Sequence, residues 1–281
     1  MKKITLLLIF ICILTGCKKA EEKTIKEQKE ETKVITYKMP EKYESRPLTE
    51  EYKIITLDKD VTITSPGTYF LTGKSSDITI TIDTSDTVEL ILSNLFITNT
   101  NKEIIKVKNT KELLITLNKK NKLITNDIST IISEEIINIG GSGSLDIISN
   151  DTGIVSTKDL IIESGKLNIT STKEAIKSDK SIYIFDTNLK IETQEDSIKS
   201  KEAILIKNGK FNIKSGEDAI KTNWDLIIDN GKFDIKTVDD AIKSDNELII
   251  NDGNINILEC NEGIESTKVK INNGNIKIKS S

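Results

Sequence analysis

The segment Asp218–Ile257, DAIKTNWDLIIDNGKFDIKTVDDAIKSDNELIINDGNINI, contains one pattern of residues twice. The motif DAIK begins at Asp218 and begins again 22 residues later at Asp240. The same interval separates a column of isoleucines: Ile154, Ile176, Ile198, Ile220, Ile242 and Ile264. A fixed period of this length is typical of a solenoid, in which each repeat buries the apolar face of its neighbours.

Inside the repeat, apolar and polar residues alternate, as in Phe211–Ile213 and Phe233–Ile235. This period of two is typical of strands with one buried face, and no helical spacing occurs in the repeat. Turn signals that favour positive φ stand between the strands: Asn208-Gly209, Asn230-Gly231, Asp252-Gly253 and Asn273-Gly274. We therefore expect an all-β fold, a single-stranded parallel β-helix with coils of about 22 residues. Equivalent residues of successive coils would stack ~4.8 Å apart.

The strand pattern continues upstream with less regular spacing, and we expect Val61–Gly73 to supply the opening strands. At the other end, Val269 follows Leu248 by 21 residues, so the final coil is one residue shorter than the others. The predicted β-helix domain spans residues 51–281.

The amino terminus has the pattern of an export signal. Lys2 and Lys3 precede an apolar run from Ile4 to Leu14, which is too short to span a bilayer. The run ends in Leu-Thr-Gly-Cys17, which resembles a bacterial lipobox and implies cleavage before Cys17 and lipidation of that residue. We predict a lipoprotein signal peptide over residues 1–17 and a disordered, charged tether over residues 18–50. The expected location is extracytoplasmic, lipid-anchored at a membrane or the cell surface.

Composition excludes several classes of function. With no histidine in 281 residues, the chain cannot form a Ser-His-Asp or Cys-His catalytic site or a zinc site that uses imidazole. The formal net charge of −4 gives no reason to expect a nucleic-acid partner. Once Cys12 leaves with the signal and Cys17 takes the lipid, Cys260 is a single thiol, which we expect to be packed and inert.

Carboxylates gather at the start of successive repeats. One column contains Glu174, Asp196, Asp218, Asp240 and Glu262, and three repeats add a preceding acid at Glu195, Glu217 and Asp239. At ~4.8 Å, repulsion between neighbouring charges is about 1 kcal/mol in water and about 3 kcal/mol at an effective dielectric of about 20. Calcium would offset this repulsion, and its candidate ligands are Glu195, Asp196, Glu217, Asp218, Asp239 and Asp240.

Lysines repeat three residues after these acids, at Lys177, Lys199, Lys221 and Lys243. Pairing between the two columns is the alternative to calcium, because it would neutralise the acids without a metal. The lysines could also contact the carboxylates of an acidic polysaccharide, act as a base if desolvation removed a proton, or form a solubilising row. Trp224 is the only tryptophan, and its ring could stack on a sugar or pack locally.

Several phrases of the chain together resemble the bacterial carbohydrate-binding domain β-helix proteins, a secreted group similar in fold to pectate lyases. The phrases are GTYFLTG from Gly67, VELILSNLFITNT from Val88, IIKVKNTKELLITL from Ile104, GSGSLDI from Gly141, and a repeated D-G-I-x-S-x-x-x-L-x-I-x-x-G-x-L-x-I. The resemblance covers the chain from about Lys53 to its end. It implies a right-handed parallel β-helix, bound calcium, and affinity for cellulose-like or pectate-like polysaccharide, generally without lyase activity.

The chain departs from the family pattern in two features, the Gly of the repeated motif and the acidic insert. Its Asp corresponds to Asp196, Asp218 and Asp240, whereas its Gly is present at Gly153 and Gly263 and is replaced at Ala175, Ser197, Ala219 and Ala241. The acidic insert of the family is reduced to NDISTIISEEIIN, residues 126–138.

The sequence therefore predicts a surface lipoprotein that binds acidic or cellulosic polysaccharide with calcium and does not cleave it. The candidate ligand-binding residues are Lys177, Lys199, Lys221, Lys243 and Trp224. A calcium-dependent pectate-type lyase and a structural adhesin without glycan specificity are the alternatives. The sequence names neither the glycan nor an oligomeric state.

Overall fold

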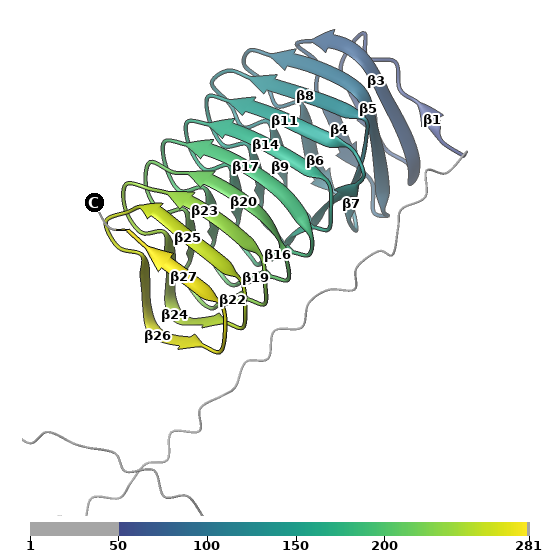
Figure 1. The fold of residues 1–281 in the computed structure, drawn as a ribbon. Coiled ribbons are helices and arrows are strands. Elements are labelled where there is room, and N and C mark those ends of the chain that lie inside the picture. Colours follow the sequence, from purple (N-terminus) through teal and green to yellow (C-terminus); the bar gives the residue numbers. More distant parts are fainter. Residues whose placement is uncertain (1–50, 280–281) are drawn as a thin grey trace, which may run out of the picture. The chain divides into compact units, whose positions relative to one another are not determined.

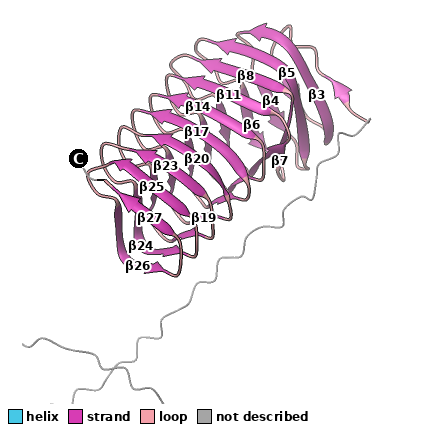
Figure 2. Ribbon diagram, in the orientation of Figure 1, coloured by secondary structure: helices cyan, strands magenta, loops and turns pink. Residues whose placement is uncertain are grey.

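The computed structural model describes residues 51–279, which contain 27 strands and no helix. The strands wind into a parallel β-solenoid whose coils follow one another along its length (Figure 1). Figure 2 shows strands alternating with short turns throughout this range. The predicted signal peptide, lipidated Cys17 and tether lie outside the described residues. Within the described range, no helix is long and apolar enough to cross a membrane.

Each regular coil supplies one strand to each of three parallel stacks. The first stack contains β2 Val61–Ile63, β4 Ile80–Asp83, β6 Ile105–Asn109, β9 Ile131–Ser133, β12 Ile154–Ser156, β15 Ile176–Ser178, β18 Ile198–Ser200, β21 Ile220–Thr222, β24 Ile242–Ile250 and β26 Ile264–Ile271. The second stack contains β1 Lys53–Ile54, β3 Gly67–Ser76, β5 Val88–Asn99, β7 Leu113–Asn118, β10 Ile137–Gly141, β13 Leu160–Ile162, β16 Ile182–Ile184, β19 Ile204–Ile206, β22 Leu226–Ile228, and the second halves of β24 and β26.

The third stack begins with the second halves of β3 and β5. It continues through β8 Lys120–Thr125, β11 Ser144–Ser149, β14 Lys166–Ser171, β17 Thr187–Thr193, β20 Gly209–Lys214, β23 Lys232–Lys236, β25 Asn254–Glu259 and β27 Asn275–Ile278. Its strands are longer than the three-residue strands that the regular coils supply to the other stacks. This stack is therefore the broadest flat surface of the regular coils.

The register confirms the period predicted from the sequence. Ile198 pairs with Ile220 in the first stack, and Phe211 pairs with Phe233 in the third. The inward isoleucines and leucines of successive coils form one continuous buried cluster along the solenoid. Inside it the rings of Phe211 and Phe233 stack with centroids 4.3 Å apart. Burial of these columns is the main stabilising contribution, at about 25 cal/mol for each Å² removed from water.

Hydroxyl side chains close the corners between stacks. Ser200 Oγ donates to the carbonyl of Lys180 at 2.6 Å, and Ser244 Oγ donates to the carbonyl of Trp224 at 2.6 Å. These bonds join one coil to the preceding one, and they reinforce long backbone bonds at the bends, where the same two carbonyls accept from Glu202 N–H at 3.4 Å and Asn246 N–H at 3.3 Å.

The two ends differ from the regular coils. The first strand is β1, which precedes the expected opening at Val61, because Lys53 and Ile54 pair with β3 and Tyr52 stacks on Phe70. In the last coil, β26 pairs with β24 through a register shift that places Val269 opposite Leu248, as the 21-residue interval predicts. Cys260 is fully buried near this end, and its Sγ lies 3.8 Å from the carbonyl of Lys279, which confirms a packed thiol.

Candidate functional site

The predicted lysine column forms a ladder on the outside of the first stack. Lys177, Lys199, Lys221 and Lys243 follow one another in register along β15, β18, β21 and β24. We call these four residues the lysine ladder. Each is partly exposed, so the sequence correctly placed them in vertical alignment at the surface.

Each lysine of the ladder is paired with the acid three residues before it. Lys177 Nζ lies 2.6 Å from Glu174, Lys199 Nζ lies 2.8 Å from Asp196, and Lys221 Nζ lies 2.7 Å from Asp218. The fourth pair joins Lys243 Nζ to Asp240 at 2.8 Å. We call the four acids Glu174, Asp196, Asp218 and Asp240 the acid ladder. All four are buried, so they depend on the lysines for their neutralisation.

The central aspartates use both of their carboxylate oxygens within the protein. Asp196 Oδ1 accepts a hydrogen bond of 3.0 Å from the backbone N–H of Asp218, and Asp218 Oδ1 accepts one of 2.9 Å from Asp240. Their Oδ2 atoms accept no hydrogen bond within the described range, although they lie within 2.8 Å of the lysine ammonium groups. We treat those contacts as ion pairs, since attraction between charges needs no hydrogen-bond angle.

The ion pairs determine the protonation state of the central lysines. Burial lowers the pKa of Lys199, but pairing with Asp196 outweighs it and leaves that pKa above its ordinary value. The pKa of Lys221 is raised in the same way by Asp218 and Asp196. Lys199 and Lys221 therefore hold their protons, whereas a lysine that acts as a base needs a lowered pKa.

The last coil breaks this balance. Burial and a hydrogen bond with the Glu265 carboxyl raise the pKa of Asp240 to about 6, despite its ion pair with Lys243. Lys243 is shared between Asp240 and Glu265. One cation thus faces two carboxylates, and the C-terminal end of the ladders has an excess of negative charge.

The six predicted calcium ligands do not form one site. In the described part of the chain, carboxylate oxygens come within 4.8 Å of one another in two groups, Asp218 with Asp239 and Asp240, and Asp240 with Glu262 and Glu265. Glu195, Asp196 and Glu217 belong to neither group. The donor oxygens suit calcium at the C-terminal end, whereas Asp196 and Asp218 are already engaged with lysine and backbone N–H groups.

Trp224 lies in the turn between β21 and β22, three residues after Lys221. Its side chain is 42% exposed, so ring stacking on a sugar is sterically open. Neither Trp224 nor any lysine of the ladder lines a hollow of the third stack.

A second set of lysines lies on the outward face of the third stack, and the sequence analysis did not assign it a role. The set contains Lys122, Lys166, Lys190, Lys210, Lys214, Lys232 and Lys236. Fewer acids share this face: Asp146, Glu192, Asp234 and Glu259. We call this face the third-stack surface, and its excess of lysine makes it cationic.

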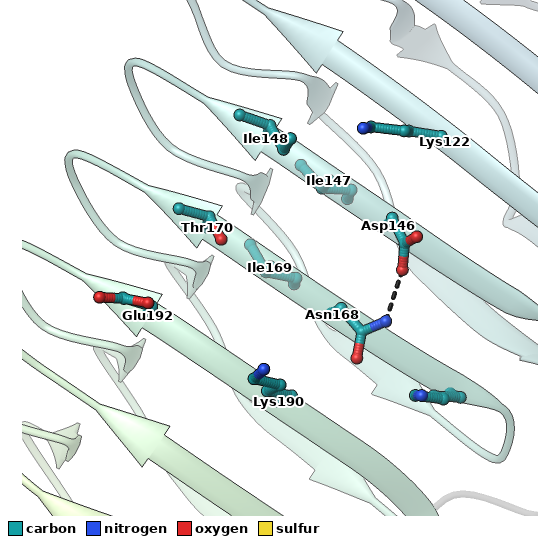
Figure 3. Close-up of a pocket in the computed structure, with 10 residues that line it drawn as sticks. Lys122, Asp146, Ile147, Ile148, Asn168, Ile169, Thr170, Lys190 and Glu192 are labelled. Atoms are coloured by element: carbon teal, nitrogen blue, oxygen red, sulfur yellow. Dashed lines mark hydrogen bonds between the residues drawn. The ribbon is translucent and has the colours of Figure 1, made fainter.

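A hollow of about 340 Å³ opens on this surface across β8, β11, β14 and β17. Figure 3 shows two rows of side chains, one from Lys122 to Lys190 and the other from Ile148 to Glu192. In the first row Asn168 Nδ2 donates to Asp146 Oδ1 at 2.5 Å, while Asn168 Oδ1 has no partner within the described range. We call this the charged hollow.

Three lysines of the charged hollow form no close ion pair, although Lys190 acts through space on Glu192 and helps Lys214 to lower the pKa of that carboxylate. Lys122, Lys166 and Lys190 form no ion pair with a described residue, whereas every member of the lysine ladder does. Glu192 of the same lining is neutralised by Lys214 at 2.7 Å, which lowers the pKa of Glu192. Positive charge is therefore available to a ligand in the hollow.

A second hollow, of about 470 Å³, lies at the ends of β11, β14, β17 and β20. Its lining is mostly hydroxyl, amide and apolar, and includes Thr170, Thr172, Gln194, Gly216 and Val238. Glu192 and Lys214 supply its charges, and they form the ion pair described above. We call this the neutral hollow.

The sequence matches a described family over residues 57–281, that of the carbohydrate-binding domain-containing proteins. The chain belongs to this family. The resemblance stated from its motifs is thus confirmed, and the family's description suggests a carbohydrate partner.

A solved structure described as a polysaccharide lyase-like protein from C. thermocellum, in a gadolinium derivative, is similar to this chain. The match has a TM-score of 0.61 and 23% identity, and covers 79% of this chain and 92% of the other. At this identity the likeness supports the fold. No curated protein matches the chain.

Proposed function

We propose that the protein binds acidic polysaccharide without cleaving it, through the third-stack surface. The observation that carries the proposal is the charged hollow, where Lys122, Lys166 and Lys190 have no ion-pair partner in the described range. In a carbohydrate-binding family, a group of lysines without a close carboxylate suits a polymer that carries carboxylates.

The lysine ladder is the weaker candidate for this contact. A glycan carboxylate that approached Lys199 would compete with Asp196, which is buried and would lose its neutralising charge. Leaving a buried carboxylate unpaired costs several kcal/mol, on the order of 3 to 5. We therefore assign the ladder a structural role and the third-stack lysines the binding role.

Binding without cleavage follows from the state of the lysines. A lyase needs a base to remove a proton from the sugar ring, and the ladder lysines that were candidates hold their protons. The test of this part is incubation with polygalacturonate and calcium, with no ultraviolet-absorbing unsaturated product expected.

The proposal includes one calcium-binding site. Asp239, Asp240, Glu262 and Glu265 lie at the C-terminal end, where Lys243 balances part of their charge. A divalent ion held there would supply the missing positive charge and fix the last coil. The lipid anchor at Cys17 completes the proposal by holding the binding surface at a membrane.

The direct experiment measures binding of the full chain to polygalacturonate and to cellohexaose. We expect the polygalacturonate affinity of the double variant Lys166→Gln, Lys190→Gln to fall about tenfold, or about 1.4 kcal/mol, because two unpaired charges are lost. The matched control is Lys108→Gln, an exposed lysine on β6 outside the hollows.

Three results would contradict the proposal in different ways. Equal loss in the double variant and the control would remove the third-stack surface as the site. Preference for cellohexaose would indicate a neutral glycan instead. Absence of binding to both glycans would favour a structural adhesin.

A further inference from the structure

The charged and neutral hollows form one trough. Ile148, Thr170 and Glu192 line both of them. The trough follows the strand direction: in β14, Lys166 begins the strand in the charged hollow and Ser171 ends it in the neutral hollow. Six residues of strand extend about 20 Å, which is long enough for a short oligosaccharide segment.

The two ends of the trough differ in charge. Lys122, Lys166 and Lys190 stand at the charged end without ion-pair partners among described residues. At the other end, the charges of Glu192 and Lys214 cancel, and Thr172 and Gln194 offer neutral hydrogen-bonding groups. A sugar carboxylate at this neutral end would lose water without gaining a cation, which is unfavourable.

Apolar side chains flank the neutral end. Ile148 is 38% exposed and pairs in register with Thr170, so its methyl groups lie where the two hollows join. Val238 is 71% exposed but follows β23, four coils further along the solenoid. Gly216 also lines the neutral hollow, where any side chain would collide with the backbone of Gln194. This end suits an uncharged sugar that carries an apolar group, because contact with a methyl group would remove apolar surface from water.

We propose that the trough takes an acidic heteropolysaccharide, in which a carboxylate-bearing sugar alternates with an uncharged sugar that carries an N-acetyl or similar group. The inference rests on the proposed function and adds the composition of the ligand. The charged sugar lies between Lys166 and Lys190, and its neighbour lies over Thr170 against Ile148, which pairs in register with Thr170. The protein would discriminate between polysaccharides because one end of the trough is cationic and the other is uncharged.

Calorimetry on the full chain with three hexasaccharides tests this inference. The probes are hyaluronan hexasaccharide, which alternates glucuronate with N-acetylglucosamine, hexagalacturonate, which is charged on every sugar, and N-acetylchitohexaose, which is uncharged. We expect the alternating probe to bind at least about tenfold more tightly than each uniform probe. Hexagalacturonate binding as tightly as the alternating probe would overturn the inference and leave the proposed function standing. Failure of both acidic probes to bind would overturn both.

A variant without a change of charge isolates the neutral end. The variant Ile148→Ser should weaken the alternating probe about fivefold and leave hexagalacturonate within about twofold. The matched control Val269→Ser removes an exposed valine in β26, outside the trough, and should change neither affinity. Equal weakening of both acidic probes by Ile148→Ser would contradict the assignment of Ile148.

Discussion

The protein carries two sets of outward lysines, one on the first stack and one on the third, and they differ in their neighbours. On the first stack, Lys199 and Lys221 each lie within 2.8 Å of a buried aspartate. On the third stack, Lys166 and Lys190 lie beside a hollow and form no close ion pair among the described residues. The first set neutralises the protein's own acids, and the second leaves its charge available.

The difference comes from the bonds made by the residue three positions earlier. In the lysine ladder this residue is an acid whose buried carboxylate lies within reach of the lysine. Three residues before Lys166 stands Glu163, which is also a buried acid, but its carboxylate accepts a hydrogen bond from Asn138 Nδ2 at 3.0 Å. Three residues before Lys190 stands Thr187, which has no charge. A lysine is thus neutralised only where the preceding acid is directed toward it.

The largest expected effect is on stability. Asp218→Ala should lower the free energy of unfolding by about 3 kcal/mol, because it removes one member of a buried ion pair. It also removes the acceptor of the Asp240 backbone N–H. Urea denaturation gives the value.

Asp234→Ala is the matched control for this change. Asp234 is an outward residue of the third stack whose carboxylate accepts a hydrogen bond from Asn256 at 3.1 Å. We expect a loss below about 1 kcal/mol for a partly exposed residue of this kind. Equal losses in the two variants would show that the acid ladder is not a structural element.

The next largest expected effect is stabilisation by a calcium ion bound at the C-terminal end. At a hundredfold excess over the dissociation constant, an ion bound to the folded protein should stabilise it by about 2.7 kcal/mol. The double variant Glu262→Gln, Glu265→Gln should abolish this gain, because it removes two of the carboxylates around Asp240.

Asp196→Asn serves as the control, and the gain that calcium produces should persist in it, whatever its own stability. Thermal unfolding with and without chelator checks both variants. A melting temperature that chelator does not change in the unaltered protein would refute a bound calcium ion.

The architecture could be predicted because the repeat can be read directly from the order of residues in the sequence. The interval of 22 residues sets which residues stack, and alternation sets which of them point inward. Both are visible without knowing the bends, so the columns of Ile198 and Phe211 were placed correctly. The shortened final coil was predicted from the same counting.

The distribution of charge at the site could be predicted in part. The pairing of Lys199 with Asp196 was one of two alternatives for the acid column, and the structure shows that pairing. The burial of Asp196 and its bond to the next coil depend on the angle of the bend, which no local pattern encodes.

The trough was missed because its residues come from separate coils and share no motif. That Lys122, Asn168 and Val238 line the same trough can be seen only when strand lengths and turns are known. The available signal was the excess of lysine at outward positions between the inward residues of the third strand, as in Lys210 and Lys232.

The central claim is that the third-stack lysines bind glycan and the ladder lysines do not. Acylation of lysines in the full chain, with and without polygalacturonate, followed by mass spectrometry of the peptides, tests it most directly. We expect polygalacturonate to slow modification of Lys166 and Lys190 and to leave Lys199 and Lys221 unchanged. Protection of Lys199 and Lys221, with Lys166 and Lys190 unaffected, would contradict the account.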